Sequence, residues 1–208
     1  MSEEETNRRA NEKARKRKEA RDKMLAEKTV EKGLLIVHTG KGKGKSTAAF
    51  GLAARALGND MRVGVVQFVK GAWRSGERRV LERFGKQIDI RVMGEGFTWE
   101  TQDRARDIRA AKSAWQAAEE MIAACKGDKP AYDLILLDEL NIVLRYDYLP
   151  IDEVMKTLRA RPSMLHIVVT GRNAREEMID AADLVTEMVA VKHPFREQNV
   201  RAQRGIEF

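Results

Sequence analysis

The feature that most constrains this 208-residue chain is a short apolar run followed at once by glycines and lysines. The run, residues 34–38, is rich in branched side chains, which is typical of a buried strand. A helical pattern that ends at Gly58 comes after it. Strand, glycine-rich turn and helix in this order predict a phosphate-binding site. We call the segment between strand and helix the glycine-lysine loop: Thr39-Gly40-Lys41-Gly42-Lys43-Gly44-Lys45-Ser46-Thr47.

Glycines let a backbone curl until several N–H groups point inward, and a helix that begins near Lys45 adds the positive end of its dipole. We expect Lys45 to reach the outer phosphates of ATP and the Ser46 hydroxyl to meet a bridging Mg²⁺. The alternative is a flexible basic turn. The usual pattern, G-x-x-x-x-G-K-[ST], requires glycine at position 39, where this chain has threonine and Gly40 follows one place later. The expected ATP contacts are Gly40, Lys41, Gly42, Lys43, Gly44, Lys45, Ser46 and Thr47.

Apolar runs that alternate with helical patterns predict the rest of the fold. Five further strands are expected at residues 63–69, 88–92, 134–137, 165–170 and 184–189, and the longer helices at 47–58, 103–126 and 152–160. This alternation predicts an α/β protein with a mostly parallel six-stranded sheet and helices on both faces. Together with the glycine-lysine loop it indicates a P-loop NTPase architecture of RecA-like type.

The first 32 residues differ in composition from the rest. Residues 1–33 hold 11 Lys/Arg and 8 Asp/Glu and few large apolar groups, so they form a charged arm that is helical or disordered. Residues 33–208 are expected to be the domain that carries the P-loop and binds ATP. The net charge is +7, of which the body beyond residue 33 carries only +4, so charge alone does not favour a nucleic-acid partner.

The chain shows no sign of export or membrane insertion. No apolar run reaches the roughly 20 residues of a membrane-spanning helix, and the acidic start lacks the apolar stretch of a secretory signal. The single cysteine, Cys125, cannot form an internal disulfide and is expected to be a small core residue. These features favour a cytoplasmic protein with no membrane partner.

A second half of the nucleotide site is expected at the end of the fourth strand. Four apolar residues place Asp138 and Glu139 at its carboxyl edge, where open α/β sheets bind ligands. One of these carboxylates should hold Mg²⁺, directly or through water. The alternative is a helix cap, since Asp138 precedes a helical pattern.

Other candidate residues lie on loops. Phe97 and Trp99, flanked by glycines, would form an apolar wall for a flat ligand or a partner, or else would anchor the loop to the core. Arg172 follows the fifth strand and is either a phosphate contact or a surface arginine. Magnesium, a lysine and two carboxylates fit kinases, ATPases and nucleotide transferases alike, so the fold does not decide the chemistry.

The set of motifs resembles the P-loop type of corrinoid adenosyltransferase, the cob(I)yrinic acid a,c-diamide adenosyltransferase family of cobalamin biosynthesis. The similarity covers about residues 30–208, and the shifted loop glycine is the family's own form. The motifs that carry it are the glycine-lysine loop with Ala48-Ala49, Gln67-Phe68-Val69-Lys70-Gly71, Phe97-Thr98-Trp99, Leu137-Asp138-Glu139-Leu140-Asn141, Thr170-Gly171-Arg172, Val185-Thr186-Glu187-Met188, Lys192-His193-Pro194-Phe195 and Ala202-Gln203-Arg204-Gly205-Ile206-Glu207.

The resemblance implies that a corrinoid cobalt, reduced to Co(I), attacks the 5′ carbon of ATP and that triphosphate leaves, in cobalamin biosynthesis or salvage. It also implies that ATP binds in the reverse of the orientation found in most P-loop proteins. The leaving triphosphate would then lie on the loop, with Lys45 stabilising its charge. Co(I) is itself a strong nucleophile, so no general base is expected. Phe97 and Trp99 would lie at the lower corrin face, so the resemblance implies that the domain of residues 33–208 binds the corrinoid as well as ATP. An electron-donating reductase and a homodimer, with the charged arm folding over a site, are the implied partners.

Two rival functions stay open from the residues alone. The first is an ATPase or kinase that binds ATP in the ordinary orientation, which would release ADP without a corrinoid. The second is a nucleic-acid-binding module that uses the basic arm, which would bind oligonucleotides tightly and with strong salt dependence.

Overall fold

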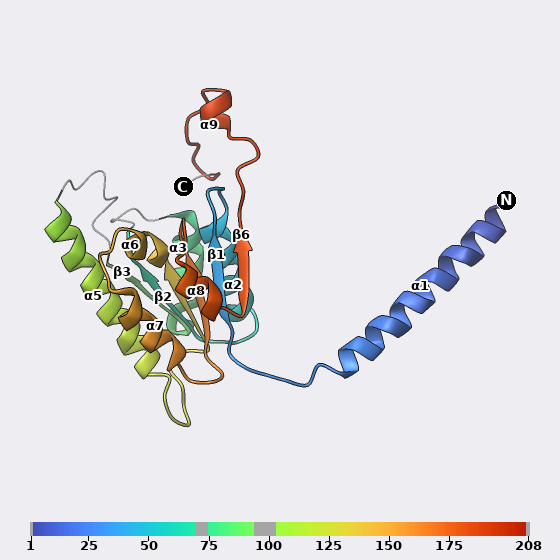
Figure 1. The fold of residues 1–208 in the computed structure, drawn as a ribbon, viewed down its shortest axis with the longest axis horizontal. Helices are drawn as coiled ribbons and strands as arrows, with labels where there is room; N and C mark the ends of the chain where they lie inside the picture. The colour runs from blue at the N-terminus through green and yellow to red at the C-terminus, as the bar shows by residue number, and fades with distance from the viewer. Residues whose placement is uncertain (1, 70–74, 94–102, 207–208) are drawn as a thin grey trace. The chain divides into compact units, whose positions relative to one another are not determined.

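The computed structural model describes residues 2–69, 75–93 and 103–206 (Figure 1). The chain divides into two units, Met1–Lys32 and Gly33–Phe208. In the first unit, helix α1 (Glu3–Ala26) begins where the Ser2 hydroxyl accepts a hydrogen bond from the Glu5 N–H at 3.2 Å. None of the helix residues is buried, and side-chain pairs such as Arg9–Glu5 lie along its surface. Of the two expected states of the arm, the structure has the helical one.

The second unit is built on a six-stranded sheet in the order β3-β2-β4-β5-β1-β6. All five neighbouring pairs are parallel. The prediction of an α/β protein with a six-stranded sheet is therefore confirmed. The sequence predicted a mostly parallel sheet, and in the structure every neighbouring pair of strands is parallel. The strands are β1 (Leu35–Thr39), β2 (Val63–Gln67), β3 (Ile88–Val92), β4 (Leu134–Asp138), β5 (His166–Thr170) and β6 (Leu184–Glu187).

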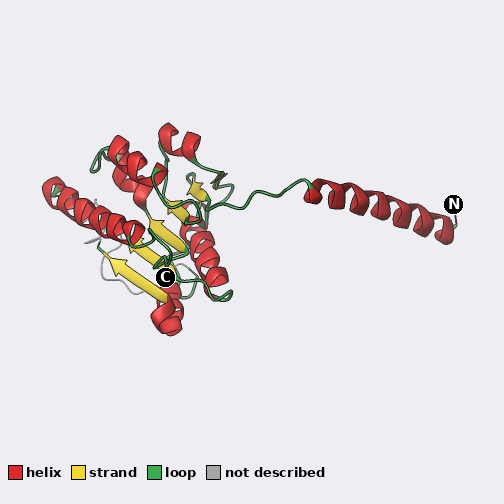
Figure 2. Ribbon diagram, turned by 90° about the horizontal axis from the view of Figure 1, so that it is seen from below, coloured by secondary structure: helices red, strands yellow, loops and turns green. Residues whose placement is uncertain are grey.

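Helices cover both faces of this sheet (Figures 1 and 2). One face packs against α2 (Lys45–Leu57) and α3 (Gly76–Leu81), which continues into the 3₁₀ segment η1 (Glu82–Gln87). The opposite face packs against four helices: α5 (Arg104–Ala123), α6 (Leu140–Arg145), α7 (Ile151–Arg159) and α8 (Glu176–Ala181). A last short helix, α9 (Pro194–Glu197), lies in the C-terminal segment. No helix among the described residues is long and apolar enough to cross a membrane.

Alternation along the strands divides the core into two layers. In β1, Leu35 and Val37 pack with α5–α8, whereas Ile36 packs with α2. Strands β1, β2 and β4 are buried at every position, because helices cover both of their faces. The edge strands β3 and β6 are only partly buried, which explains why their apolar runs are weaker in the sequence.

The structure differs from the sequence prediction at strand ends and short helices. The second and sixth strands end two residues earlier than expected, at Gln67 and Glu187. After Glu187, the Met188 N–H still donates to the Thr39 carbonyl at 2.9 Å, but the Met188 carbonyl turns to the glycine-lysine loop. Helices α6 and α8 have six residues each, too few for a helical period to be recognised.

The sheet topology brings three segments to one edge. Strands β1, β5 and β4 are consecutive neighbours and run in the same direction. Their carboxyl ends, Thr39, Thr170 and Asp138, therefore lie at the same edge, with β5 between the other two. This edge carries the glycine-lysine loop and the residues that follow Asp138 and Thr170.

Candidate functional site

The glycine-lysine loop joins β1 to α2 at this edge. Gly40 has φ 94° and Gly44 has φ 102°, in the left-handed region that L side chains rarely adopt. Gly44 is the N-cap residue of α2, no side chain makes a capping hydrogen bond, and the first turn carries no acidic residue. The start of α2 therefore presents N–H groups and a positive dipole end without a carboxylate of its own.

The loop is held against the residues that follow β6. The Gly42 N–H donates to the Met188 carbonyl oxygen at 2.6 Å. A β-carbon on Gly42 would lie 2.7 Å from that oxygen, and one on Gly40 would lie 2.5 Å from it. Only glycine fits at these two positions, so the pattern of glycines reflects close backbone packing as well as torsion angles.

Lys45 lies inside the loop. Its side chain is only 7% exposed, and its Nζ donates to the Gly42 carbonyl oxygen at 2.5 Å. Burial lowers the pKa of Lys45; the charge of Glu139 opposes this shift, and that of Arg172 adds to it. Glu139 and Arg172, predicted separately after β4 and β5, thus lie close enough to Lys45 to act on it electrostatically.

Asp138 is fully buried at the end of β4 and is held by the two neighbouring strands. Its Oδ1 accepts from the Thr170 hydroxyl of β5 at 2.8 Å, and its Oδ2 accepts from Gln67 Nε2 of β2 at 3.0 Å. These side chains point to the α2 side of the sheet, as the alternation in each strand requires. These two donors hold the carboxylate in one orientation.

Glu139 occupies the turn between β4 and α6. Its φ is 66°, and its N–H donates to the Thr170 hydroxyl at 2.9 Å. It is the N-cap residue of α6, yet its carboxylate makes no capping hydrogen bond. A β-carbon on Gly171 would lie 3.2 Å from Glu139 Oε2, which shows how closely the turns after β4 and β5 approach.

The remaining predicted residues differ in exposure. Ser46 is half-buried in the first turn of α2, and Lys41, Lys43 and Thr47 are exposed. Arg172 is exposed after β5. Phe97 and Trp99 lie outside the described residues.

Sequence reasoning assigned no role to several polar residues of the site. Gln67 and Thr170 hold Asp138, and two further buried groups, both nitrogens of His38 and Oδ1 of Asn141, lack a hydrogen-bond partner within the described parts of the chain. Burial lowers the pKa of His38. In the sheet register Gln67 lies opposite Asp138, and His38 opposite Thr170. Gln67, Thr170 and His38 are polar residues at or near the ends of otherwise apolar strands, and this is the signal that could have identified them.

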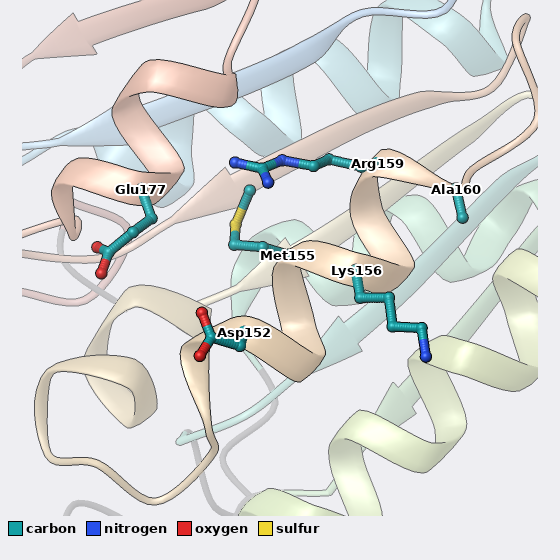
Figure 3. Close-up of a pocket in the computed structure, with 6 residues that line it drawn as sticks. All are labelled: Asp152, Met155, Lys156, Arg159, Ala160 and Glu177. Carbon is teal, nitrogen blue, oxygen red and sulfur yellow. The ribbon is translucent and has the colours of Figure 1, made fainter.

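A shallow depression of about 660 Å³ lies elsewhere, between α7 and α8 (Figure 3). Asp152, Lys156, Arg159 and Glu177 are among its lining residues, which come from helix surfaces. None of the residues predicted for the nucleotide site lines it. The shape of the surface alone therefore does not locate the chemistry.

Taken together, a parallel sheet, a glycine loop before an uncapped helix and paired carboxylates after a neighbouring strand define an α/β protein of the nucleotide-binding class. The family profile described as ATP:corrinoid adenosyltransferase BtuR/CobO/CobP matches residues 31–208. The chain belongs to this family. It is accordingly a transferase, an ATP:corrinoid adenosyltransferase of cobalamin metabolism, as the resemblance in the sequence implied.

Related proteins agree with this assignment. The chain is similar to a corrinoid adenosyltransferase of Sinorhizobium sp, 53% identical over 195 residues that cover 93% of this chain and 88% of that one. It is 50% identical to that of Pseudomonas aeruginosa over 204 residues, 98% of each chain. It is 46% identical to corrinoid adenosyltransferase CobA of Salmonella typhimurium over 187 residues, 90% of this chain and 91% of that one.

Proposed function

We propose that the glycine-lysine loop binds the triphosphate of ATP as a leaving group. The observation that carries this proposal is the grouping of Lys45, Glu139 and Arg172 around an uncapped helix start. A buried cation and oriented N–H donors favour negative charge at this place. Contacts from Gly40 to Thr47 and from Arg172 would hold the three phosphates.

In the proposed reaction, the Co(I) of the reduced corrinoid attacks the 5′ carbon of ATP. The new bond joins cobalt to carbon, and the bond between the 5′ carbon and the triphosphate oxygen breaks. The electron pair of that bond leaves with the triphosphate, so its charge grows during the step. Lys45 stabilises this growing charge, and no general base is required because the nucleophile carries no proton.

Mg²⁺ is part of the proposal. Ser46, Asp138 and Glu139 offer hydroxyl and carboxylate oxygens, the donor type that Mg²⁺ prefers. The carboxylate of Asp138 already accepts from Gln67 and Thr170, which suits contact with the ion through water, whereas the half-buried Glu139 is better placed for direct contact. When bound, the ion would neutralise charge on the triphosphate.

The corrinoid side of the site rests on the family resemblance. Phe97 and Trp99 are proposed to cover the lower corrin face and to exclude an axial ligand, which eases reduction to Co(I). A reductase must then supply the electron. We further propose a cytoplasmic homodimer, in which the charged arm of residues 1–32 folds over a site.

The test is an assay with ATP, Mg²⁺ and chemically reduced corrinoids, scored for the cobalt–carbon bond and for the phosphate product. Triphosphate without ADP supports the proposal. ADP released without corrinoid would favour the ATPase or kinase instead, and tight, salt-sensitive binding of oligonucleotides would favour the nucleic-acid module.

A variant separates the two halves of the site. Trp99→Ala should impair adenosylation under reducing conditions and leave ATP binding largely intact. An equal loss of both would contradict the role given to Trp99.

A further inference from the structure

Four side chains at the carboxyl edge form a continuous stack outside the nucleotide site. The guanidinium of Arg145 lies 5.4 Å from the ring centre of Tyr146, and that of Arg104 lies 5.8 Å from the ring centre of Tyr148. The two tyrosine rings are themselves stacked, with centres 5.7 Å apart and planes at 24°. An arginine thus closes each end of an aromatic pair.

Neighbouring groups fix the stack in place. Tyr148 is buried, and its hydroxyl donates to Asp107 at 3.3 Å. With the Asn173 amide turned so that its oxygen faces Arg145, this oxygen accepts from Nε at 3.2 Å and from Nη1 at 3.1 Å. Nothing in the described chain bonds to Nη2 of Arg145. A guanidinium fixed on an aromatic face keeps edge donors available for a planar anion.

Neither cation has a carboxylate partner among the described residues. Within residues 2–69, 75–93 and 103–206, no carboxylate lies at ion-pair distance from Arg104 or Arg145. The nearby Asp147 pairs with Arg175, and Asp107 accepts from Tyr148. Two ordered positive groups without a carboxylate partner in the described parts of the chain favour an anionic ligand.

The stack lies at the same carboxyl edge of the sheet as the candidate site. Arg145 is the last residue of α6, which begins directly after Glu139, so helical rise places it about 9 Å further along. Its partner Asn173 follows Arg172, whose charge acts on Lys45. Arg104 begins α5, whose first turn lies at this edge (Figure 1).

We propose that Arg104 and Arg145 bind free carboxylates on the periphery of the corrinoid and so make the enzyme selective for acidic corrinoids. The macrocycle carries acetate and propionate side chains, which are carboxylates in early precursors and amides in later ones. Bidentate arginine–carboxylate bonds would form only with the acidic forms. This inference rests on the family's reaction and concerns which substrate the same site prefers.

The experiment compares three chemically reduced corrinoids with each enzyme. Cobyrinic acid a,c-diamide carries free carboxylates, cobinamide carries amides and no phosphate, and cobalamin carries amides and a phosphodiester. Arg104→Gln and Arg145→Gln should each raise KM for the acidic corrinoid roughly 10- to 100-fold, the loss expected for one charged hydrogen-bonded pair. KM for cobinamide and for ATP, and kcat with the acidic corrinoid, should stay within about twofold, since one charged contact is the only one removed.

Arg109→Gln is the matched control, because Arg109 is exposed on the same helix α5 and has no place in the stack. Arg109→Gln should leave KM unchanged for each of the three corrinoids. Arg145→Lys, which keeps the charge and loses the planar fork, should lose part of the selectivity.

Three results would overturn the inference. An equal change for all corrinoids would mean that the stack only supports the fold, a change for cobalamin alone would mean that a phosphate is bound, and a rise in KM for ATP would place the arginines on the nucleotide. Failure of the proposed function is distinct, because the wild-type chain would then form no cobalt–carbon bond with any of the three.

Discussion

The backbone N–H of Gly42 donates to the carbonyl of Met188 at 2.6 Å, which ties the glycine-lysine loop to the chain just beyond β6. Met188 in turn donates to Thr39 at 2.9 Å, so the loop and the edge strand support each other through backbone atoms alone. This contact explains a glycine that torsion angles do not require, since Gly42 has no positive φ. The loop conformation therefore depends on close approach at Gly42.

Gly42→Ala should displace the loop. The new β-carbon would lie 2.7 Å from the Met188 oxygen and 2.8 Å from its carbonyl carbon, both backbone atoms that cannot move independently. We expect ATP affinity to fall roughly 5- to 150-fold, which corresponds to an over-packing cost of about 1–3 kcal/mol. Titration of the protein with ATP measures it.

Gly51→Ala, within α2, is the matched control. A β-carbon there meets nothing within 4 Å, and the residue is exposed in mid-helix. The thermal midpoint should rise by about 1–4 °C, because alanine favours helix over glycine. ATP affinity should be unchanged. Weakening by Gly51→Ala as large as that by Gly42→Ala would refute the packing explanation.

Thr170→Val should uncouple the carboxylate of Asp138 from its neighbours. The hydroxyl of Thr170 donates to Asp138 and accepts the N–H of Glu139, so valine removes both bonds at nearly constant volume. Oδ1 of Asp138 and the N–H of Glu139 each lose this bond, while Gln67 still donates to Oδ2 of Asp138, and the loss should cost about 1–3 kcal/mol. Denaturant unfolding measures the loss, and the Mg²⁺ concentration needed for adenosylation should rise.

Thr170→Ser retains the hydroxyl and should restore most of the Mg²⁺ response, although it deletes a buried methyl group. If serine and valine behave alike, packing at position 170 matters and the hydrogen bonds do not.

Lys45→Met should separate binding from stability. The methionine preserves much of the packing volume and removes a charge whose burial lowers the pKa of Lys45. The free energy of unfolding should therefore stay equal or increase, because no desolvated charge remains. ATP should bind roughly 10- to 100-fold more weakly, and adenosyl transfer should decline with it, since a charged contact to the phosphates is lost.

Lys112→Met, an exposed position on α5, controls for the loss of one positive charge. A similar effect of both variants on ATP binding would indicate a general electrostatic influence and would leave Lys45 without a specific role.

The sequence predicted the sheet well because its central strands are covered on both faces. Such strands read as unbroken apolar runs, and residues 34–38 and 134–137 are placed within one residue of β1 and β4. The site was predicted only where a residue type carries its own chemistry, as for Lys45 and Asp138. Contacts that depend on register, such as Gln67 with Asp138, require the strand order, which no local pattern contains.

The Arg104–Tyr148 and Arg145–Tyr146 contacts illustrate the same limit. Each arginine is one of many charged residues in the sequence, and the two tyrosines flank a single aspartate. Arg145 and Tyr146 are neighbours in the chain, but Arg104 reaches Tyr148 only because α5 packs beside the turn that follows α6 on one face of the sheet. Long-range packing of this kind leaves no periodic signal.

His38 should make the stability of the protein depend on pH. Burial lowers the pKa of this imidazole, whose two nitrogens have no hydrogen-bond partner in the described chain. As pH falls through the ordinary histidine value of about 6.5, the unfolded chain takes up a proton that folded His38 does not, so unfolding is favoured. This loss of stability continues until the pH reaches the lowered pKa of the folded state. His38→Leu removes this titration, so the thermal midpoint of the variant should fall less than that of the wild type between about pH 7.5 and pH 5. The difference between the two proteins should be roughly 2–4 °C for each kcal/mol of stability that the wild type loses through His38. Parallel curves for the two proteins would show that His38 is protonated as easily in the folded state as in the unfolded one.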